Sequence, residues 1–277
     1  FMYNYNLAGQ QQLAEGIPFF NVIPDPHSIN PLFIATDATA NIGFDAKSSK
    51  VVHSLFPDTK MIEAGWFVRP EFEQNLGDTS QEAITRHKKE AREKIGLEPD
   101  RFTVLITSGS EGTNMVLKLL PALFSNANKV QVVVACGSNR HLFRVVKSFA
   151  NFLAQMKQQA ILLPVGFTTE LHTYMTAADI IVGKAGPNTI FESVACLRPF
   201  FAITHIAGQE TGNLELIKEY NIGFVQESPL YAPRLLKSII ANPKLLNKFT
   251  KSIIALAKKN AQAHTVLSKT LLSEVNS

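Results

Sequence analysis

Short apolar runs alternate with longer amphipathic segments along most of the chain. The runs are almost continuous in Val, Ile, Leu and Phe, as in "TVLIT" and "QVVVAC", so neither face of the predicted strands would meet water. Strands that alternate with amphipathic helices predict an α/β fold, in which a parallel sheet carries helices on both faces. The predicted strands lie at residues 17–23, 103–109, 131–137, 160–166, 179–183 and 199–204.

A charged stretch interrupts this alternation and predicts a linker that leads into an exposed helix. It lies between residues 72 and 101, and we place a domain boundary near residues 70–80. The sequence therefore predicts an N-terminal domain, a C-terminal domain and an amphipathic helical tail. These parts span residues 1–75, 76–245 and 246–277.

The predicted tail helix has one apolar face and a lysine-rich remainder. Leu246, Phe249, Ile253 and Leu256 share the apolar face. A basic amphipathic helix can lie on an anionic membrane. Such a helix can also pack its apolar face on the protein and leave its lysines in water, and the sequence leaves both interpretations open.

Composition narrows the classes of partner. The 277 residues are 45% apolar, which is enough for more than one core. The net charge of +4 suits phosphate groups, but the dense basic runs of nucleic-acid-binding proteins are absent, so we expect no nucleic-acid partner. Cys136 and Cys196 lie in apolar runs without a C-x-x-C spacing, which favours core packing in a reduced compartment and no metal.

No apolar run has the roughly 18 residues that a membrane span needs. We therefore expect a cytoplasmic protein, with peripheral contact at the inner face of an anionic membrane as a further option. The chain opens with a predicted helix and strand and no initiator Met, so we expect it to begin inside a domain.

A turn rich in glycine and small polar residues follows the strand that starts at residue 103. Ligands bind beyond the carboxyl ends of parallel strands, where amides and a helix N-terminus stabilise phosphate. The spacing matches neither a P-loop nor a dinucleotide fingerprint, so a plain strand-to-helix turn stays open. The residues of this turn are Ser108, Gly109, Ser110, Glu111 and Gly112.

Two later turns carry polar side chains that suit a sugar nucleotide. After residues 179–183 the chain turns into a helix that bears Glu192, whose carboxylate could accept two hydrogen bonds from a ribose diol. After residues 199–204 comes a cluster that contains Gln209, Glu210 and Asn213, and such groups suit sugar hydroxyls. Taken singly, an acidic helix start and a capped solvated loop explain these residues equally well.

Together, these turns resemble glycosyltransferase family 28. The motifs are "GKAGPNTIFE", "GQETGN" and "LEPDRFTVLITSGSEGTN", and the likeness is greatest to diacylglycerol glucosyltransferases and monogalactosyldiacylglycerol synthases. It extends to "GIPFFNVIPDPH" and "KMIEAGWFVRPEF", which are similar to the end of that family's acceptor domain. The resemblance implies a GT-B fold, with two Rossmann-like domains around a cleft and an apparently truncated N-terminal domain.

The resemblance also implies an activity. Such enzymes move a hexose from a UDP-sugar to a lipid acceptor such as diacylglycerol, with inversion and with no cofactor or obligatory metal. Helix N-termini and backbone amides can stabilise the departing UDP instead. The implied contacts are Ser108 to Gly112 for the diphosphate, Gly166, Phe167 and Thr168 for uracil, Ala185, Gly186, Pro187, Asn188 and Thr189 for the phosphate side, Glu192 for ribose, and Gln209, Glu210 and Asn213 for the hexose.

The general base is the point where this sequence departs from the family, whose proposed base belongs to a segment before residue 1. Among the groups present, His27 is our candidate, because imidazole titrates near the operating pH. Asp25 and Asp37 are the alternatives. Two other functions stay open, namely a UDP-N-acetylglucosamine 2-epimerase-like enzyme and a non-catalytic donor-binding subunit or fragment.

Overall fold

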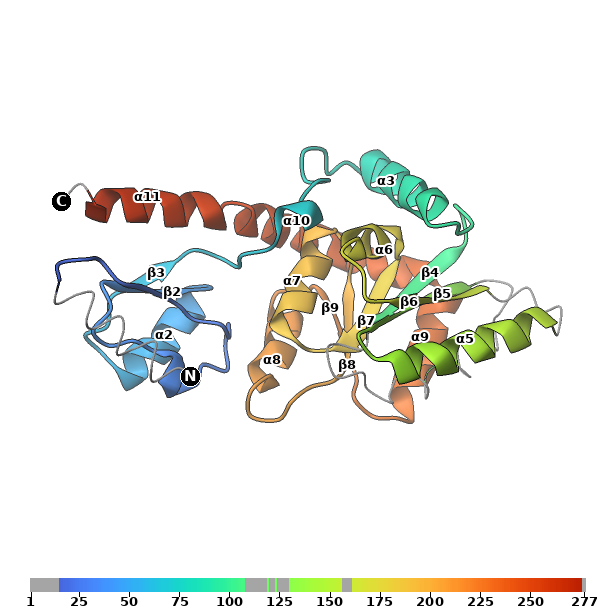
Figure 1. Cartoon of the computed structure of the whole chain (residues 1–277), viewed down its shortest axis with the longest axis horizontal. Coiled ribbons are helices and arrows are strands. Elements are labelled where there is room, and N and C mark those ends of the chain that lie inside the picture. Colours follow the sequence, from blue (N-terminus) through green and yellow to red (C-terminus); the bar gives the residue numbers. More distant parts are fainter. Residues whose placement is uncertain (1–14, 108–118, 120–122, 124–129, 156–160, 276–277) are drawn as a thin grey trace.

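The computed structural model describes residues 15–107, 119, 123, 130–155 and 161–275. These residues form two lobes, each built on its own parallel sheet (Figure 1). The first lobe holds the three-stranded sheet and helix α2, and the second lobe holds the six-stranded sheet and the helices around it. The predicted α/β fold with parallel sheets is confirmed.

The first lobe has the strand order β1-β2-β3. Helix α2 begins at Asp45, whose carboxylate accepts a hydrogen bond from the Ser48 backbone amide at 2.8 Å. The Ser48 hydroxyl lies 3.4 Å from the Asp45 amide, which completes a capping box and explains why the helix starts there. The elements are β1 (Phe20–Val22), η1 (Pro31–Phe33), β2 (Ala40–Gly43), α2 (Ala46–Leu55) and β3 (Met61–Glu63).

The second lobe has the strand order β6-β5-β4-β7-β8-β9, with every pair parallel. The chain first builds outward from β4 through β5 to β6, and then returns to the other side of β4 with β7. This reversal creates a switch point between β4 and β7, where open α/β sheets bind their ligands. The strands are β4 (Phe102–Thr107), β5 (Val130–Gly137), β6 (Ile161–Gly166), β7 (Ile180–Lys184), β8 (Phe200–Thr204) and β9 (Gly223–Val225).

Helices cover both faces of this sheet, and successive residues of one strand enter different cores. In β4, Leu105 packs with Phe191 and Phe249 on one face, while Val104 and Ile106 pack with Val146 on the other. Because helices cover both faces of the sheet, the side chains on both faces of each strand are buried, which explains the continuous apolar runs. The helices are η2 (Pro70–Phe72), α3 (Gln81–Lys94), α5 (Arg140–Gln155), α6 (Leu171–Ala177), α7 (Pro187–Ala195), α8 (Thr211–Glu219), α9 (Tyr231–Ala241), η3 (Pro243–Leu246), α10 (Asn247–Asn260) and α11 (Ala263–Val275).

Three strands of the structure were not among those that the sequence predicted. They are β2, β3 and β9, and each has only three or four residues. Runs this short carry no clear periodic signal, because two or three apolar residues fit a strand and a loop equally well.

Helix α10 packs back on the body of the protein. Phe249, Ile253 and Leu256 on α10 are buried in the core that also contains α7, so this apolar face is already covered. The segment between β3 and α3, residues 64–80, connects the two lobes, and we call it the connector (Figure 1). Asn260 accepts a hydrogen bond from the Trp66 backbone amide at 3.2 Å, so the end of α10 is held against this connector. In the part of the chain that the structure describes, no helix combines the length and the apolar character of a membrane span.

Aromatic rings join the two lobes. Phe44, just after β2, lies 4.8 Å from Phe191 on α7 between ring centroids. Trp66, just after β3, stacks on the same Phe191 ring at 4.8 Å with an interplanar angle of 20°. Tyr220, just after α8, lies 5.5 Å from Phe44. We call these four residues the aromatic junction. It fixes the carboxyl ends of the first sheet against α7.

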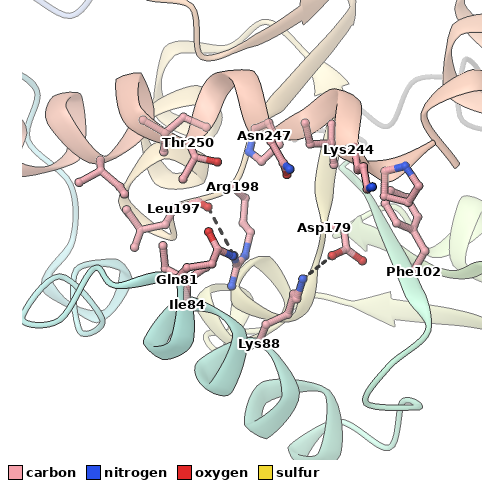
Figure 2. Close-up of a pocket in the computed structure, with 15 residues that line it drawn as sticks. Gln81, Ile84, Lys88, Phe102, Asp179, Leu197, Arg198, Lys244, Asn247 and Thr250 are labelled. Carbon is pink, nitrogen blue, oxygen red and sulfur yellow. Dashed lines mark hydrogen bonds and ion pairs between the residues drawn. The ribbon is translucent and has the colours of Figure 1, made fainter.

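Ion pairs stabilise the opposite, amino edge of the large sheet. A cavity of about 230 Å³ lies there between α3 and α10 (Figure 2). The Asp179 carboxylate, which lines this cavity, forms ion pairs with the Lys88 ammonium and the Arg92 guanidinium, each at 2.6 Å. The Asp179 carboxylate also accepts the Thr103 amide at 2.7 Å, so it ties the start of β4 to α3.

We predict that Asp179→Asn lowers the free energy of unfolding by about 3–5 kcal/mol, because it leaves buried cations without their carboxylate. Asp100→Asn is the matched control. Asp100 also forms an ion pair with a lysine, Lys89, at 2.6 Å, but its side chain is 81% exposed, so we expect no measurable loss of stability. Urea unfolding of both variants measures the difference. Equal losses would contradict the account.

Candidate functional site

The switch point between β4 and β7 is a close strand contact. Thr107 at the end of β4 pairs with Gly183 in β7. A Cβ at Gly183 would collide with the Thr107 hydroxyl, so glycine is required where these strands meet. The turn that follows β4, with the predicted diphosphate residues Ser108, Gly109, Ser110, Glu111 and Gly112, lies outside the described residues.

The turn after β7 presents the start of helix α7 at this edge. The Ala185 amide donates to the Thr204 carbonyl at 2.8 Å, which holds the turn against β8. Pro187 occupies the first turn of α7, where its missing N–H costs nothing. The N-cap Gly186 has no side chain to occupy the amides of the first turn, around Asn188 and Thr189. This geometry can bind an anionic group at the helix start.

Glu192 lies one turn further along α7 and is mostly buried, with a side-chain exposure of 16%. Burial raises the pKa of its carboxyl, and the Arg69 guanidinium at 3.5 Å works against that rise. Arg69 reaches across from the connector and packs over the Phe72 ring at 4.9 Å. The motif "KMIEAGWFVRPEF", which contains Arg69, gave no sign of this contact, because only the fold brings the guanidinium to Glu192.

The turn after β8 is held to the turn after β7 by two of its predicted hexose-binding residues. Glu210 accepts the Lys184 ammonium at 2.6 Å and the Ile206 amide at 2.8 Å. Asn213 is fully buried and donates to the Ala185 carbonyl at 2.8 Å. These contacts show that Glu210 and Asn213 shape the edge itself, and their contact with a hexose stays a prediction.

The predicted uracil turn lies at the same edge but further from the switch point. Gly166 ends β6, and Phe167 beyond it is 81% exposed. The Thr168 hydroxyl accepts the Glu170 amide at 2.9 Å, which shapes the entry into α6. An exposed aromatic ring beside a glycine turn is available for a flat ligand, and the uracil role stays a prediction.

A cavity of about 550 Å³ lies between the lobes, and we call it the interlobe cavity. Asp25, His27 and Ser28 from the first lobe and Gly208 and Gln209 from the second are among its lining residues. Of the predicted hexose-binding residues, Gln209 is thus the one that faces this space. The cavity brings polar groups of both lobes to one place.

The two lobes make a close contact beside this cavity, at His27 and Ser28. The Gly212 amide donates to the Ser28 hydroxyl at 2.5 Å. A Cβ at Gly212 would lie 2.7 Å from that hydroxyl and 2.8 Å from the His27 Cβ. Glycine at the start of α8 therefore allows the first lobe to approach this closely.

His27, the candidate base, is engaged in this contact. Its side chain is 1% exposed, and Nε2 lies 3.0 Å from Asp45 Oδ2. The same oxygen accepts the Tyr220 hydroxyl at 2.6 Å. Burial alone would raise the pKa of Asp45, but hydrogen bonds from His27, Tyr220 and Ser48 outweigh it and hold the pKa below its usual range. These contacts give His27 a place in the lobe junction, and its catalytic role stays a prediction.

A second, apolar cavity of about 190 Å³ lies beyond the carboxyl ends of the first sheet. Val22, Ile42, Trp66 and Phe67 line it from the first lobe. Asn188, at the start of α7, lines it from the second lobe. We call it the apolar cavity. It places a hydrophobic surface next to the predicted phosphate-binding helix.

The matched part of the chain runs from β4 to the start of α8. Residues 103–213 match the family model described as the glycosyltransferase family 28 C-terminal domain. This part of the chain is therefore similar to glycosyltransferase family 28. The match covers β4, β7 and β8, whose ends form the edge described above, and it confirms the resemblance seen in the sequence.

Curated relatives agree with this assignment. Over 212 residues the chain is 28% identical to "Monogalactosyldiacylglycerol synthase 3, chloroplastic" from Arabidopsis thaliana. That alignment covers 74% of this chain and 42% of the synthase, so the chain spans less than half of that relative.

Solved structures show the same fold at low sequence identity. HepE from Anabaena in complex with UDP matches with a TM-score of 0.61 and 15% identity, over 99% of this chain and 77% of that one. The UDP-GlcNAc 2-epimerase from Neisseria meningitidis bound to UDP-GlcNAc matches with a TM-score of 0.65 and 15% identity, over 96% and 72%. The GT-B type of fold predicted for this chain is confirmed.

Acid should weaken the lobe junction through Asp45. The low pKa of a folded-state carboxyl adds stability that is present above the unfolded pKa of about 4 and is lost as the pH falls further. We therefore predict that Asp45→Asn costs most stability near pH 7, and that its difference from the wild type shrinks towards pH 2. Asp58→Asn, at an exposed position, is the control. Urea unfolding across pH tests this, and a constant difference would contradict it.

Proposed function

We propose that the chain transfers a hexose from a UDP-sugar to a lipid acceptor of the diacylglycerol type. The observation that carries the proposal is the position of the apolar cavity, which adjoins the α7 start inside the part of the chain that is similar to family 28. The matched proteins support the two substrates separately. One is named a monogalactosyldiacylglycerol synthase, and two are solved structures with bound UDP or UDP-GlcNAc.

In this proposal the donor lies along the carboxyl edge of the large sheet. The amides at the start of α7 bind the phosphate side, because a helix N-terminus stabilises negative charge. Glu192 accepts hydrogen bonds from the ribose hydroxyls, and the Arg69 guanidinium counteracts the rise that burial gives to the pKa of this carboxyl. No metal is required, since the amides and cations of the edge can stabilise the leaving UDP.

The acceptor approaches from the first lobe. The apolar cavity is large enough for the glycerol end of a lipid and its first methylene groups, and each buried CH₂ contributes about 0.8 kcal/mol. Val22 at its rim is 49% exposed, so a lipid chain can continue outward from there. We propose that the reaction takes place at a membrane surface, because the acceptor resides there.

The first experiment is donor binding by isothermal titration with UDP. We predict that Glu192→Gln weakens UDP binding by about 10-fold or more, because an amide replaces a charge-assisted acceptor worth about 1.5–3 kcal/mol. Glu93→Gln, on the exposed surface of α3, should bind UDP as the wild type does. If Glu192→Gln binds UDP unchanged, the assigned ribose contact is wrong.

The second experiment follows product formation from labelled UDP-glucose, UDP-galactose or UDP-N-acetylglucosamine with diacylglycerol. We predict that Val22→Glu lowers transfer at least about 10-fold, because it puts a charge at the rim of the apolar cavity. Leu55→Glu is the matched control, since Leu55 is 46% exposed on α2 and is not among the residues that line this cavity.

The products also separate the alternative functions. A labelled glycolipid supports the proposal. A free epimer of N-acetylglucosamine would support an epimerase, and UDP binding without any product would support a donor-binding subunit.

A further inference from the structure

Asp25 is a buried carboxylate that lines the interlobe cavity. It is 4% exposed, and it lies three residues after the end of β1, at the carboxyl edge of the first sheet. Within the described residues, none donates a hydrogen bond to its carboxylate. Buried carboxylates normally have such partners, because desolvation of an unpaired charge is costly. The ionised Asp25 carboxylate therefore carries a desolvation cost that no hydrogen bond from the described residues offsets.

The charges around Asp25 add to this cost. Burial first, and then the negative charge of Glu210, raise the pKa of Asp25 to about 6. Glu210 itself accepts the Lys184 ammonium at 2.6 Å. His27 is two residues away, but its Nε2 is directed to Asp45, and it gives Asp25 no hydrogen bond. A carboxyl with a pKa near neutrality can accept a proton at the operating pH.

The position of Asp25 suits a reacting hydroxyl group. Gln209, from the matched family 28 domain, lines the same cavity from the opposite lobe. Asp25 and His27 lie on one wall, but His27 is committed to the lobe junction through Asp45. Asp25 is thus the acidic side chain that the first lobe contributes to this cavity.

We propose that Asp25 is the general base of this chain. The lipid part of the acceptor lies in the apolar cavity, which Pro24 lines, and its hydroxyl reaches the neighbouring interlobe cavity, where the Asp25 carboxylate takes the proton. This inference rests on the proposed function. As the hydroxyl oxygen forms its bond to the anomeric carbon of the hexose, its proton passes to the Asp25 carboxylate. The bond from that carbon to the UDP oxygen breaks, and its electron pair leaves with UDP. Protonated Asp25 then returns its proton to water.

The experiment compares the wild type with Asp25→Asn, Asp25→Glu and the exposed-position control Asp58→Asn, all in the full chain. We expect Asp25→Asn to bind UDP unchanged while its kcat for transfer falls by about 10²–10⁴-fold, the usual contribution of a general base. The wild-type kcat/KM should rise through about pH 6 to a plateau, and this limb should be absent in Asp25→Asn. Asp25→Glu should retain part of the rate, and Asp58→Asn all of it.

Stability gives a second readout that does not depend on turnover. A raised carboxyl pKa makes the folded state less stable as the pH rises above the unfolded value of about 4. Asp25→Asn should therefore have a higher Tm than the wild type at pH 8, and this gain should vanish near pH 4. A structural carboxylate would show a lower Tm instead.

The outcomes separate the two proposals. Loss of turnover with UDP binding intact and a raised Tm supports Asp25 as the base. Turnover retained in Asp25→Asn, or a wild type that binds UDP but transfers to no acceptor, overturns this assignment while the donor site stands. A wild type that does not bind UDP overturns the proposed function itself.

Discussion

The aromatic junction is the contact on which the rest of the structure depends. The Phe191 ring on α7 packs against the rings of Phe44 and Trp66, which lie shortly after β2 and β3. Both rings therefore stand at the carboxyl edge of the first sheet, and Phe191 stands on the helix whose start forms the carboxyl edge of the second. Because one set of rings belongs to both edges, the two ligand-binding edges must face each other. The cavities between the lobes follow from this constraint.

The acidic side chains near the aromatic junction differ in whether they have hydrogen-bond partners, and this difference bears on function. Asp45 is satisfied by His27 and Tyr220, and Glu210 by Lys184. Each of these pairs fixes one turn or one lobe against another. Asp25 lies beside them, and no residue in the described part of the chain forms such a pair with it. Proteins retain strained or costly groups mainly where function requires them, so the unpaired carboxylate is where chemistry is expected.

The amino-acid pattern predicted much of the large sheet and little of the junction. Runs such as residues 131–137 are apolar at every position, and this pattern is decisive for a strand that is covered on both faces. The glycine turns and Glu192 were also found in the sequence, because strand ends and helix starts carry local signals. The short strands β2, β3 and β9 were missed, since three residues carry no period.

Contacts between distant residues were beyond the reach of pattern reasoning. Arg69 meets Glu192 across 123 positions, and Tyr220 meets Asp45 across 175. His27 was preferred as the base on its ordinary titration range alone. In the fold both residues line the interlobe cavity, but the His27 ring is paired with Asp45, whereas no described residue donates a hydrogen bond to the Asp25 carboxylate. Burial and partner choice, which decide such roles, are properties of the tertiary structure.

The most direct test of the central claim is a crystal structure of the chain with UDP. We predict that the nucleotide binds at the switch point between β4 and β7. Its ribose hydroxyls should lie within hydrogen-bond distance of the Glu192 carboxylate, and its phosphates should lie at the start of α7. A nucleotide bound elsewhere, or one whose ribose leaves Glu192 paired with Arg69 alone, would contradict it.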